Sequence, residues 1–263
     1  MLPDMVLIRG AGDLASGVAH RLQQSGFKVV MLELPNPMVV RTTVSFATAV
    51  LKKSITVEGV VASLCNNAKE AEELLSKHII PVIIDPEAST KKSLNPLVVI
   101  DAIMAKDNRL TKIDDAELVI GLGPGFTAGK DVHAIIETKR GHNLGKVIYR
   151  GTAAENTSIP GDIAGYGPER LLRASTGGIF KPLKNIGDLV NRGQTVATVS
   201  GKVVRAETDG MVRGMLFDGV EVKQGDKVGD VDPRGKIIDY MTISDKARAV
   251  GGGVLEAILH RYN

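Results

Sequence analysis

The stretch MVLIRGAGDLASG at residues 5–17 decides how the rest of the chain is interpreted. Its first four residues are apolar and predict a short buried β-strand. Gly10, Gly12 and Ala15 then follow the pattern G-x-G-x-x-A, and apolar residues continue at helical spacing. This order of strand, glycine turn and helix is typical of a turn that binds the pyrophosphate of a nucleotide.

The residues of this turn have distinct roles in the prediction. Gly10 permits a tight turn, Gly12 lets a pyrophosphate approach the backbone, and Ala15 lets the helix pack closely on the strand. Asp13 begins the helix, whose free N–H groups face the anion. Glu33 lies in a second predicted strand, 21 residues after Gly12, and can accept from a ribose hydroxyl. Its charge favours a free 2′-hydroxyl over a 2′-phosphate. The alternative is a glycine turn that binds nothing.

Composition limits the class of protein. A chain of 263 residues with 43% hydrophobic residues can form one large domain or two modest ones. The net charge of +3, the absence of Trp and 3% aromatic residues argue against nucleic acid and membrane surfaces as partners. No apolar run predicts a membrane span or a signal peptide, so we expect a soluble, cytoplasmic protein. Cys65 is the only cysteine, which excludes an internal disulfide and a cysteine-based metal site, and we predict no metal.

The sequence predicts three parts with an α/β fold overall. Residues 1–176 alternate strands and helices, which indicates a Rossmann-like, mostly parallel sheet that binds a nucleotide. Residues 177–240 predict a small β domain, and residues 241–263 a closing helix that packs back on the first domain. The expected strands after residue 34 lie at 55–62, 79–84, 97–100, 118–122, 146–149 and 237–241.

Further candidate binding residues follow the predicted strands, where ligands bind in open α/β sheets. Asp85, Asp101, Gly123 and Gly125 each come at a strand end. The alternative for the two aspartates is that they cap the following helices. Arg41, in the segment 39–51, is a further candidate binding residue.

The segment GLGPGFTAGKD at residues 121–131 lacks the spacing of a Walker loop but can form a glycine-walled anion pocket. In that pocket Thr127 supplies a hydroxyl and Lys130 a charge. His133 and Glu137 are expected to share a face of a helix as a surface pair. The segment 151–176 is a predicted loop, either a cover for the site with the polar residues Asn156, Thr157 and Tyr166, or a solvated linker.

An internal repeat organises the C-terminal third. GDLVNRGQTVATV at 187–199 and GVEVKQGDKVGDV at 219–231 share glycines and valines at an offset of 32 residues. Two copies of short strands predict a pseudo-symmetric barrel-sandwich of the kind found in biotinyl and lipoyl carrier domains. Lys202 lacks the sequence context of a carrier lysine, which favours a packing or docking module. Three glycines at 251–253 of the closing helix predict close packing on another backbone.

Several segments together carry a resemblance to a known family. They are RGAGDLASG, RTTVSFATAV, GLGPGFTAGKDVHAIIETKRGHNLGKVI, the IGD…GD-V-DPR block and ISDKARAVGGGVLEA. The chain resembles the YqeB-like family of selenium-dependent molybdenum hydroxylase accessory proteins over nearly its whole length. Ala11 stands where many members have glycine. The resemblance implies a role in maturing these hydroxylases or supplying their cofactor, and implies no catalytic residues.

Three functional hypotheses follow. We favour an accessory protein that binds a nucleotide-bearing cofactor, either a dinucleotide of the NAD or FAD type or molybdopterin dinucleotide. Its expected partners are a molybdenum hydroxylase or its cofactor-assembly proteins, and a homo-oligomer is compatible with this role. The alternatives are an NAD-dependent oxidoreductase, for which no histidine stands out as a proton shuttle, and a docking protein with a relic nucleotide fold.

Overall fold

The computed structural model describes residues 4–105, 107–108, 110–155 and 160–263. The chain forms two compact units. We call the first the sheet unit, which comprises Met1–Pro37, Ser45–Thr157 and Ile243–Asn263. We call the second the small unit, which comprises Met38–Val44 and Ser158–Thr242. None of the helices in the described ranges is long and apolar enough to cross a membrane.

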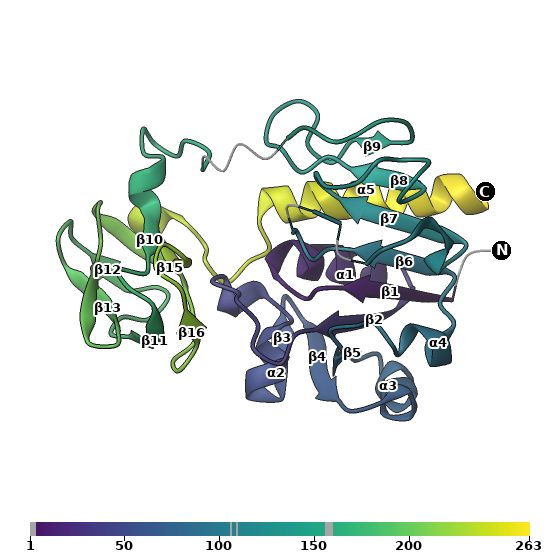
Figure 1. Cartoon of the computed structure of the whole chain (residues 1–263), viewed down its shortest axis with the longest axis horizontal. Helices are drawn as coiled ribbons and strands as arrows, with labels where there is room; N and C mark the ends of the chain where they lie inside the picture. The colour runs from purple at the N-terminus through teal and green to yellow at the C-terminus, as the bar shows by residue number, and fades with distance from the viewer. Residues whose placement is uncertain (1–3, 106, 109, 156–159) are drawn as a thin grey trace. The chain divides into compact units, whose positions relative to one another are not determined.

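The sheet unit is built on a nine-stranded, mostly parallel sheet (Figure 1). Its strand order is β3-β4-β5-β2-β1-β6-β7-β8-β9, and only the pairs β3–β4 and β8–β9 are antiparallel. The strands are β1 (Met5–Arg9), β2 (Lys28–Glu33), β3 (Ser54–Val57), β4 (Val60–Cys65), β5 (Ile80–Ile84), β6 (Val98–Asp101), β7 (Leu118–Leu122), β8 (Ala134–Ile136) and β9 (Val147–Ile148). The chain builds outward from β1 first through β2 and later through β6, so the strand order reverses at β1.

Both faces of the sheet are buried, as expected for a parallel sheet between helices. Leu7 aligns with Val30 and Val99, and this row packs with residues of α3 (Ala68–Leu75) and α4 (Lys91–Leu94). The neighbouring residue Ile8 points to the opposite face because side chains alternate along a strand. That face carries α1 (Asp13–Gln24) and α5 (Asp245–Tyr262), which lie side by side in Figure 1. The short helix α2 (Thr48–Lys52) packs against β3, β4 and β5.

The expected closing helix is present as α5, and it packs on the sheet unit through glycines. A Cβ atom on Gly17 of α1 would come within 2.6 Å of the Cβ atom of Ala247. A Cβ atom on Gly251 would lie 3.0 Å from the Gly17 carbonyl oxygen, and one on Gly253 would lie 2.9 Å from Ile136. Ser244 caps the helix, since its Oγ accepts from the Ala247 N–H at 3.2 Å. The backbones of the two helices therefore approach more closely than larger side chains would allow.

Three predicted elements differ in the structure. Residues 55–62, expected as one strand, form the β3–β4 hairpin because Glu58 and Gly59 both have positive φ and turn the chain. His133 to Glu137, expected on a helix, instead surround strand β8, whose residues are all buried. The expected strand at 237–241 is replaced by a 3₁₀ helix, η4 (Gly235–Ile237), and a turn in which the Met241 N–H donates to Asp239.

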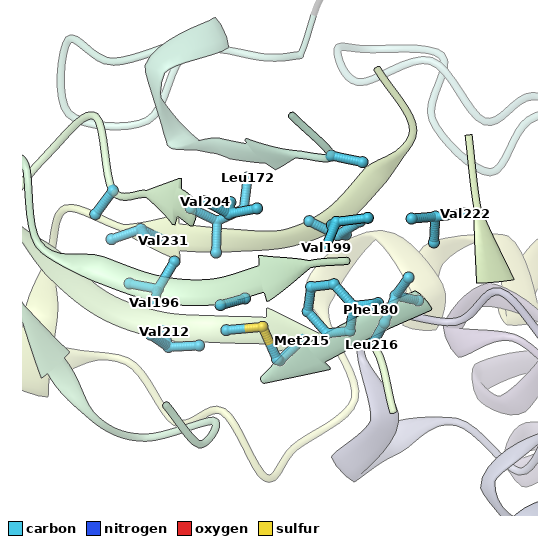
Figure 2. Close-up of a cluster of buried hydrophobic side chains, with 14 of the residues drawn as sticks. Leu172, Phe180, Val196, Val199, Val204, Val212, Met215, Leu216, Val222 and Val231 are labelled. Carbon is cyan, nitrogen blue, oxygen red and sulfur yellow. The ribbon is translucent and has the colours of Figure 1, made fainter. Parts of the chain in front are cut away.

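The small unit contains two four-stranded antiparallel sheets, in the orders β10-β17-β15-β12 and β14-β13-β11-β16. Their strands are β10 (Leu171–Arg173), β11 (Gly178–Pro182), β12 (Leu189–Val190), β13 (Thr195–Val199), β14 (Lys202–Arg205), β15 (Gly210–Met215), β16 (Glu221–Val222) and β17 (Lys227–Asp232). Buried side chains from both sheets share one core, shown in Figure 2. Phe180 and Val196 of one sheet and Val212 and Val231 of the other are fully buried there.

The hydrogen bonds of the small unit repeat at the offset of 32 residues. The Gly193 N–H donates to the Ala206 carbonyl, and the Gly225 N–H donates to the Ala174 carbonyl. Gly193 and Gly225 also have nearly equal φ angles of 83° and 85°. The repeat is therefore a structural duplication that relates the two sheets.

This duplication extends beyond the predicted boundary at 176/177. Strand β10 stands 32 residues before the middle of β14, and it pairs with β17 of the small unit. The 3₁₀ helix η3 (Pro168–Arg170) precedes it, where a short helix at 169–173 was expected. Residues 160–176 thus group with the small unit, since β10 is the edge strand of its sheet β10-β17-β15-β12.

Glycines 252 and 253 provide a test of the helix packing. We expect Gly253→Ala to destabilise the protein by about 1–3 kcal/mol, because the new methyl group overpacks the contact with Gly145 and Ile136. Gly252 has no atom within 4 Å of an added Cβ. Gly252→Ala should therefore stabilise by about 0.5–1 kcal/mol through helix propensity. Urea unfolding of both variants measures these differences, and equal effects of the two substitutions would contradict the packing.

Candidate functional site

The candidate site lies at the carboxyl edge of the parallel sheet, where β1 ends. The neighbours of β1 are β2 and β6, and the chain reaches them in opposite directions along the sheet. Such a reversal leaves a crevice outside the strand ends in open α/β sheets, and ligands bind there. The Gly10–Gly12 turn leads from β1 into α1 at this position.

Gly10 is required by the fold. Its φ angle is +94°, a region that favours glycine. A Cβ atom on Gly10 would lie 2.9 Å from the Ala102 carbonyl oxygen, which follows β6. Its N–H also donates to the Leu32 carbonyl at 2.8 Å. The first glycine of the motif therefore allows the turn to pack between the ends of β2 and β6.

Gly12 has a different environment. It is the N-cap residue of α1, with φ −65° and ψ −178°, an extended conformation open to any residue. Among the described residues no side chain caps α1. Gly12, Asp13 and Leu14 are each partly exposed. The first N–H groups of a helix have no intrahelical partner, so this end of α1 can accept an anion.

Glu33 holds the turn from the end of β2. Its Oε2 accepts from the Ala11 N–H at 2.8 Å, and its Oε1 accepts from the Leu34 N–H at 2.7 Å. Burial raises the pKa of Glu33, although both backbone hydrogen bonds act to lower it. Each carboxylate oxygen has a second lone pair, so the group can still accept from a hydroxyl. The carboxylate thus has a structural role whether or not a ribose binds.

A second clamp fixes the far side of the turn. The Ser16 hydroxyl donates to the Gly12 carbonyl at 2.8 Å and accepts from the Phe46 N–H at 2.7 Å. The Ala47 N–H donates to the Ala11 carbonyl at 2.8 Å. Ala11 is fully buried as a result. The segment before α2 therefore orders the turn without covering the start of α1.

Two residues that the sequence interpretation did not place in the site also lie at this edge. Glu137 follows β8 and is buried, and its carboxylate accepts from the Lys139 and Ala154 N–H groups at 2.7 and 2.8 Å. Lys246 is half-buried in the first turn of α5. Burial lowers the pKa of Lys246, and Arg140 adds to this, while the charges of Asp13 and Glu137 act in the opposite direction.

The predicted aspartates serve the fold. Asp101 is buried beside Arg9, with Arg9 Nη1 at 3.4 Å from its Oδ2, and its oxygens also accept from the Thr111 hydroxyl and the Ile103 N–H. Burial raises the pKa of Asp101 despite these partners. Asp85 accepts from the N–H groups of residues 89 and 90, just before α4. Asp85 thus orders the residues just before α4, as the capping alternative suggests, whereas Asp101 is held in a buried ion pair and caps none of the helices that the structure describes.

The second glycine turn is only partly at this edge. Gly123 and Gly125 both follow the end of β7. Gly123, with φ +73°, is buried against Thr138, and Gly125 is exposed. Thr127 lies in a tight turn, because its N–H donates to Asp131 at 2.7 Å. Lys130 is exposed in the same turn, which leads back to the start of β8. No hydrogen bond in the described ranges links this turn to Gly10–Gly12.

The remaining candidates belong to the small unit or fall outside the description. Arg41 is buried within Met38–Val44, and its Nη2 donates to the Thr242 carbonyl at 3.3 Å. Tyr166 is exposed and bridges to Ile163. Asn156 and Thr157 lie outside the described residues. In the ranges that the structure describes, no group of three His, Cys, Asp or Glu side chains could hold a metal ion.

Sequence alone gave little signal for Glu137 and Lys246. Glu137 was assigned to a helix surface because β8 is only three residues long and its apolar run does not distinguish strand from helix. Lys246 lies more than 230 residues from the turn in sequence, so only the packing of α5 on α1 brings it to this edge. The sequence signal for Lys246 was its place in the first turn of a predicted helix, where the helix dipole disfavours a cation.

Comparison with known proteins relates the chain to one curated sequence. It is 53% identical over 255 residues to a protein called "Uncharacterized protein YqeB" from Escherichia coli (strain K12), across 97% of this chain and 47% of that protein. The match supports a YqeB-like family. The chain spans about half the length of this YqeB relative. No family model matches the sequence.

Solved structures show only weak likeness to the chain. An aspartoacylase family protein from Mesorhizobium loti has 11% identity and a TM-score of 0.28, covering 88% of this chain and 85% of that one. A putative NAD-dependent epimerase/dehydratase from Methylobacillus flagellatus has 16% identity and a TM-score of 0.26, covering 51% and 41%. Similarities of this size carry no argument about the function of the chain.

The pKa of Glu33 predicts a pH dependence. Because the folded pKa is raised above the ordinary value of 4.5, the folded protein binds this proton more tightly than the unfolded chain does. The stabilisation that Glu33 contributes is fully present below its pKa in the unfolded chain and is lost as pH rises through its pKa in the folded protein. We expect the free energy of unfolding of the wild type, relative to Glu33→Gln, to fall as pH rises from about 4 to 7. Urea unfolding across this range tests it, and a rising difference would contradict the burial of Glu33.

Proposed function

We propose that the chain binds a nucleotide, or a nucleotide-bearing cofactor, at the carboxyl edge of a Rossmann-like sheet. The observation that carries the proposal is the uncapped, partly exposed start of α1 after a G-x-G turn at the reversal of strand order. Backbone N–H groups and the helix dipole favour a diphosphate at such a position. Glu33, at the end of the adjacent strand, supplies an acceptor for a ribose hydroxyl.

In this proposal the two glycines have separable tasks. Gly10 has positive φ and contacts Ala102, so it serves the fold. Gly12 has an ordinary backbone conformation that does not itself require glycine, and in the proposal its missing side chain leaves space for the ligand. The small unit acts in the proposal as a barrel-sandwich docking module with a partner protein.

The biological role we propose is that of an accessory protein in the maturation of selenium-dependent molybdenum hydroxylases. Support for this role comes from the family resemblance of the sequence motifs, and the YqeB relative supports the family alone. A molybdopterin dinucleotide combines the diphosphate that the turn suits with the cofactor of these enzymes. NAD and FAD carry the same diphosphate, so the identity of the bound ligand must be determined. Mass spectrometry of small molecules released from the purified native protein identifies it.

Substitutions of the two glycines test the proposed site. We expect ADP, NAD or FAD to raise the free energy of unfolding of the wild type by about 2.7 kcal/mol at 100 times the dissociation constant. Gly12→Val should abolish this ligand effect with little change in the stability of the free protein, because its side chain occupies the approach to the N–H groups. Gly10→Ala should instead destabilise the free protein by about 1–3 kcal/mol, because the alanine is strained at positive φ and its Cβ overlaps the Ala102 carbonyl. Thermal and urea unfolding with and without ligand measure both effects.

A matched control uses the capping chemistry of α1. Gly12→Ser places a hydroxyl that caps the same N–H groups, so it should leave the free protein as stable as the wild type, or slightly more so, while weakening the ligand. Wild-type protein that shows no response to any of these ligands, and releases no nucleotide when denatured, would refute the proposal and favour a docking role. Steady reduction of NAD with a substrate would support an oxidoreductase instead.

A further inference from the structure

We propose that Lys246 is a specificity-determining residue that binds the phosphates of the ligand and restricts the site to diphosphate-bearing nucleotides. This inference rests on the proposed nucleotide site and adds the residue that selects its ligand class. Three features of the molecule support it: the location of Lys246, the charges around it, and the packing of α1 against α5.

The location of Lys246 is unfavourable for a lysine without a ligand. It is the second residue of α5, after Ser244 and Asp245, where the positive end of the helix dipole repels a cation. Its side chain is half-buried. Among the described residues it makes no ion pair within 4.0 Å, although the carboxylates of Asp13, Glu137 and Asp245 lie near enough to act on its charge. The helix dipole and the partial burial of the side chain both disfavour the ammonium charge, and an anionic ligand would offset that cost.

Packing brings Lys246 to the turn that leads into α1. Gly17 is the fifth residue of α1, and an added Cβ there would meet Ala247, the third residue of α5. Further along, Arg21 Nη2 lies 3.5 Å from the Arg248 carbonyl oxygen. The two helices therefore begin within about one turn of each other, at the carboxyl edge. The carboxylate of Asp13, the first residue of α1, is therefore close enough to Lys246 for its charge to raise the pKa of Lys246, against the effect of burial.

The charges at this edge explain why one lysine matters. Asp13, Glu33 and Glu137 all lie here, and three carboxylates disfavour a diphosphate. The nearby Arg140 is paired with Asp245 at 2.7 Å, so it is already engaged. Lys246 is thus the cation that can offset Asp13 and contact a phosphate at the start of α1. Without it, N–H groups alone would face a doubly charged ligand beside an aspartate.

The test compares ADP with adenosine, which share a base and ribose and differ in the diphosphate. We expect Lys246→Met to weaken ADP binding by about tenfold or more, the scale of one charge-assisted hydrogen bond, and to leave adenosine binding unchanged. Lys246→Arg should retain most of the ADP affinity because it keeps the charge. Asp13→Asn should strengthen ADP binding, since it removes the repelling carboxylate. Isothermal titration calorimetry at low and high salt measures each affinity.

Lys77→Met is the matched control, because this exposed lysine follows α3 at the opposite edge of the sheet. It should bind ADP as the wild type does. Equal ADP affinity of the wild type and Lys246→Met would overturn the inference and leave the nucleotide site standing. Failure of the wild type to bind ADP, NAD or FAD would overturn the proposed site and this inference together. If Lys246→Met does not fold, Asp13→Asn and salt still decide it: Asp13→Asn should strengthen ADP binding and high salt should weaken it, and the absence of these shifts overturns the inference.

Discussion

The close approach of α1 and α5 is the contact on which the arrangement of the candidate site depends. Gly17 and Gly251 have no side chain at the crossing, and the Cβ of Ala247 occupies the space that Gly17 leaves. Gly253 makes a similar contact with the chain after β8. Because the helices touch near their first turns, the last helix of the chain contributes to the edge formed by the first strand. Residues from both ends of the sequence thus meet at one place.

This contact changes the electrostatics of a turn that would otherwise be mainly acidic. Asp13 and Glu33 flank the Gly10–Gly12 turn, and Glu33 is tied to it by hydrogen bonds from the backbone. The nearby Asp101 is balanced by Arg9 in a buried pair. Lys246 adds a cation that the local sequence of the turn does not contain. The charge balance of this edge is therefore a property of the tertiary structure, whereas its N–H groups come from the motif itself.

The small unit shows how a duplicated fold acquires a distinct face. Its two sheets share the same strand pattern, yet Asp230 and Asp232 are buried while the residues 32 positions earlier, Thr198 and Ser200, are more exposed. Asp232 accepts from Arg234 at 2.8 Å within the unit. Gly214 leaves room there for the Val40 carbonyl. Duplication explains the shared turns and core, and the Met215 N–H of one copy holds the segment around Val40 by donating to the Val40 carbonyl at 2.7 Å.

The sequence by itself determined the elements whose signals are local. The glycine turn after β1, the closing helix α5 and the 32-residue repeat all appear in the structure, because strand and helix periodicity and turn chemistry act over a few residues. Predictions failed where length or context was ambiguous: β8 was taken for a helix, the β3–β4 hairpin for one strand, and β10 was assigned to the wrong unit. Only the tertiary structure showed that Asp85 and Asp101 accept hydrogen bonds from neighbouring groups of the fold, and only it placed Lys246 near Asp13 and Glu137 at the carboxyl edge of the sheet. Such pairings depend on packing between segments far apart in the chain, and no local pattern encodes them.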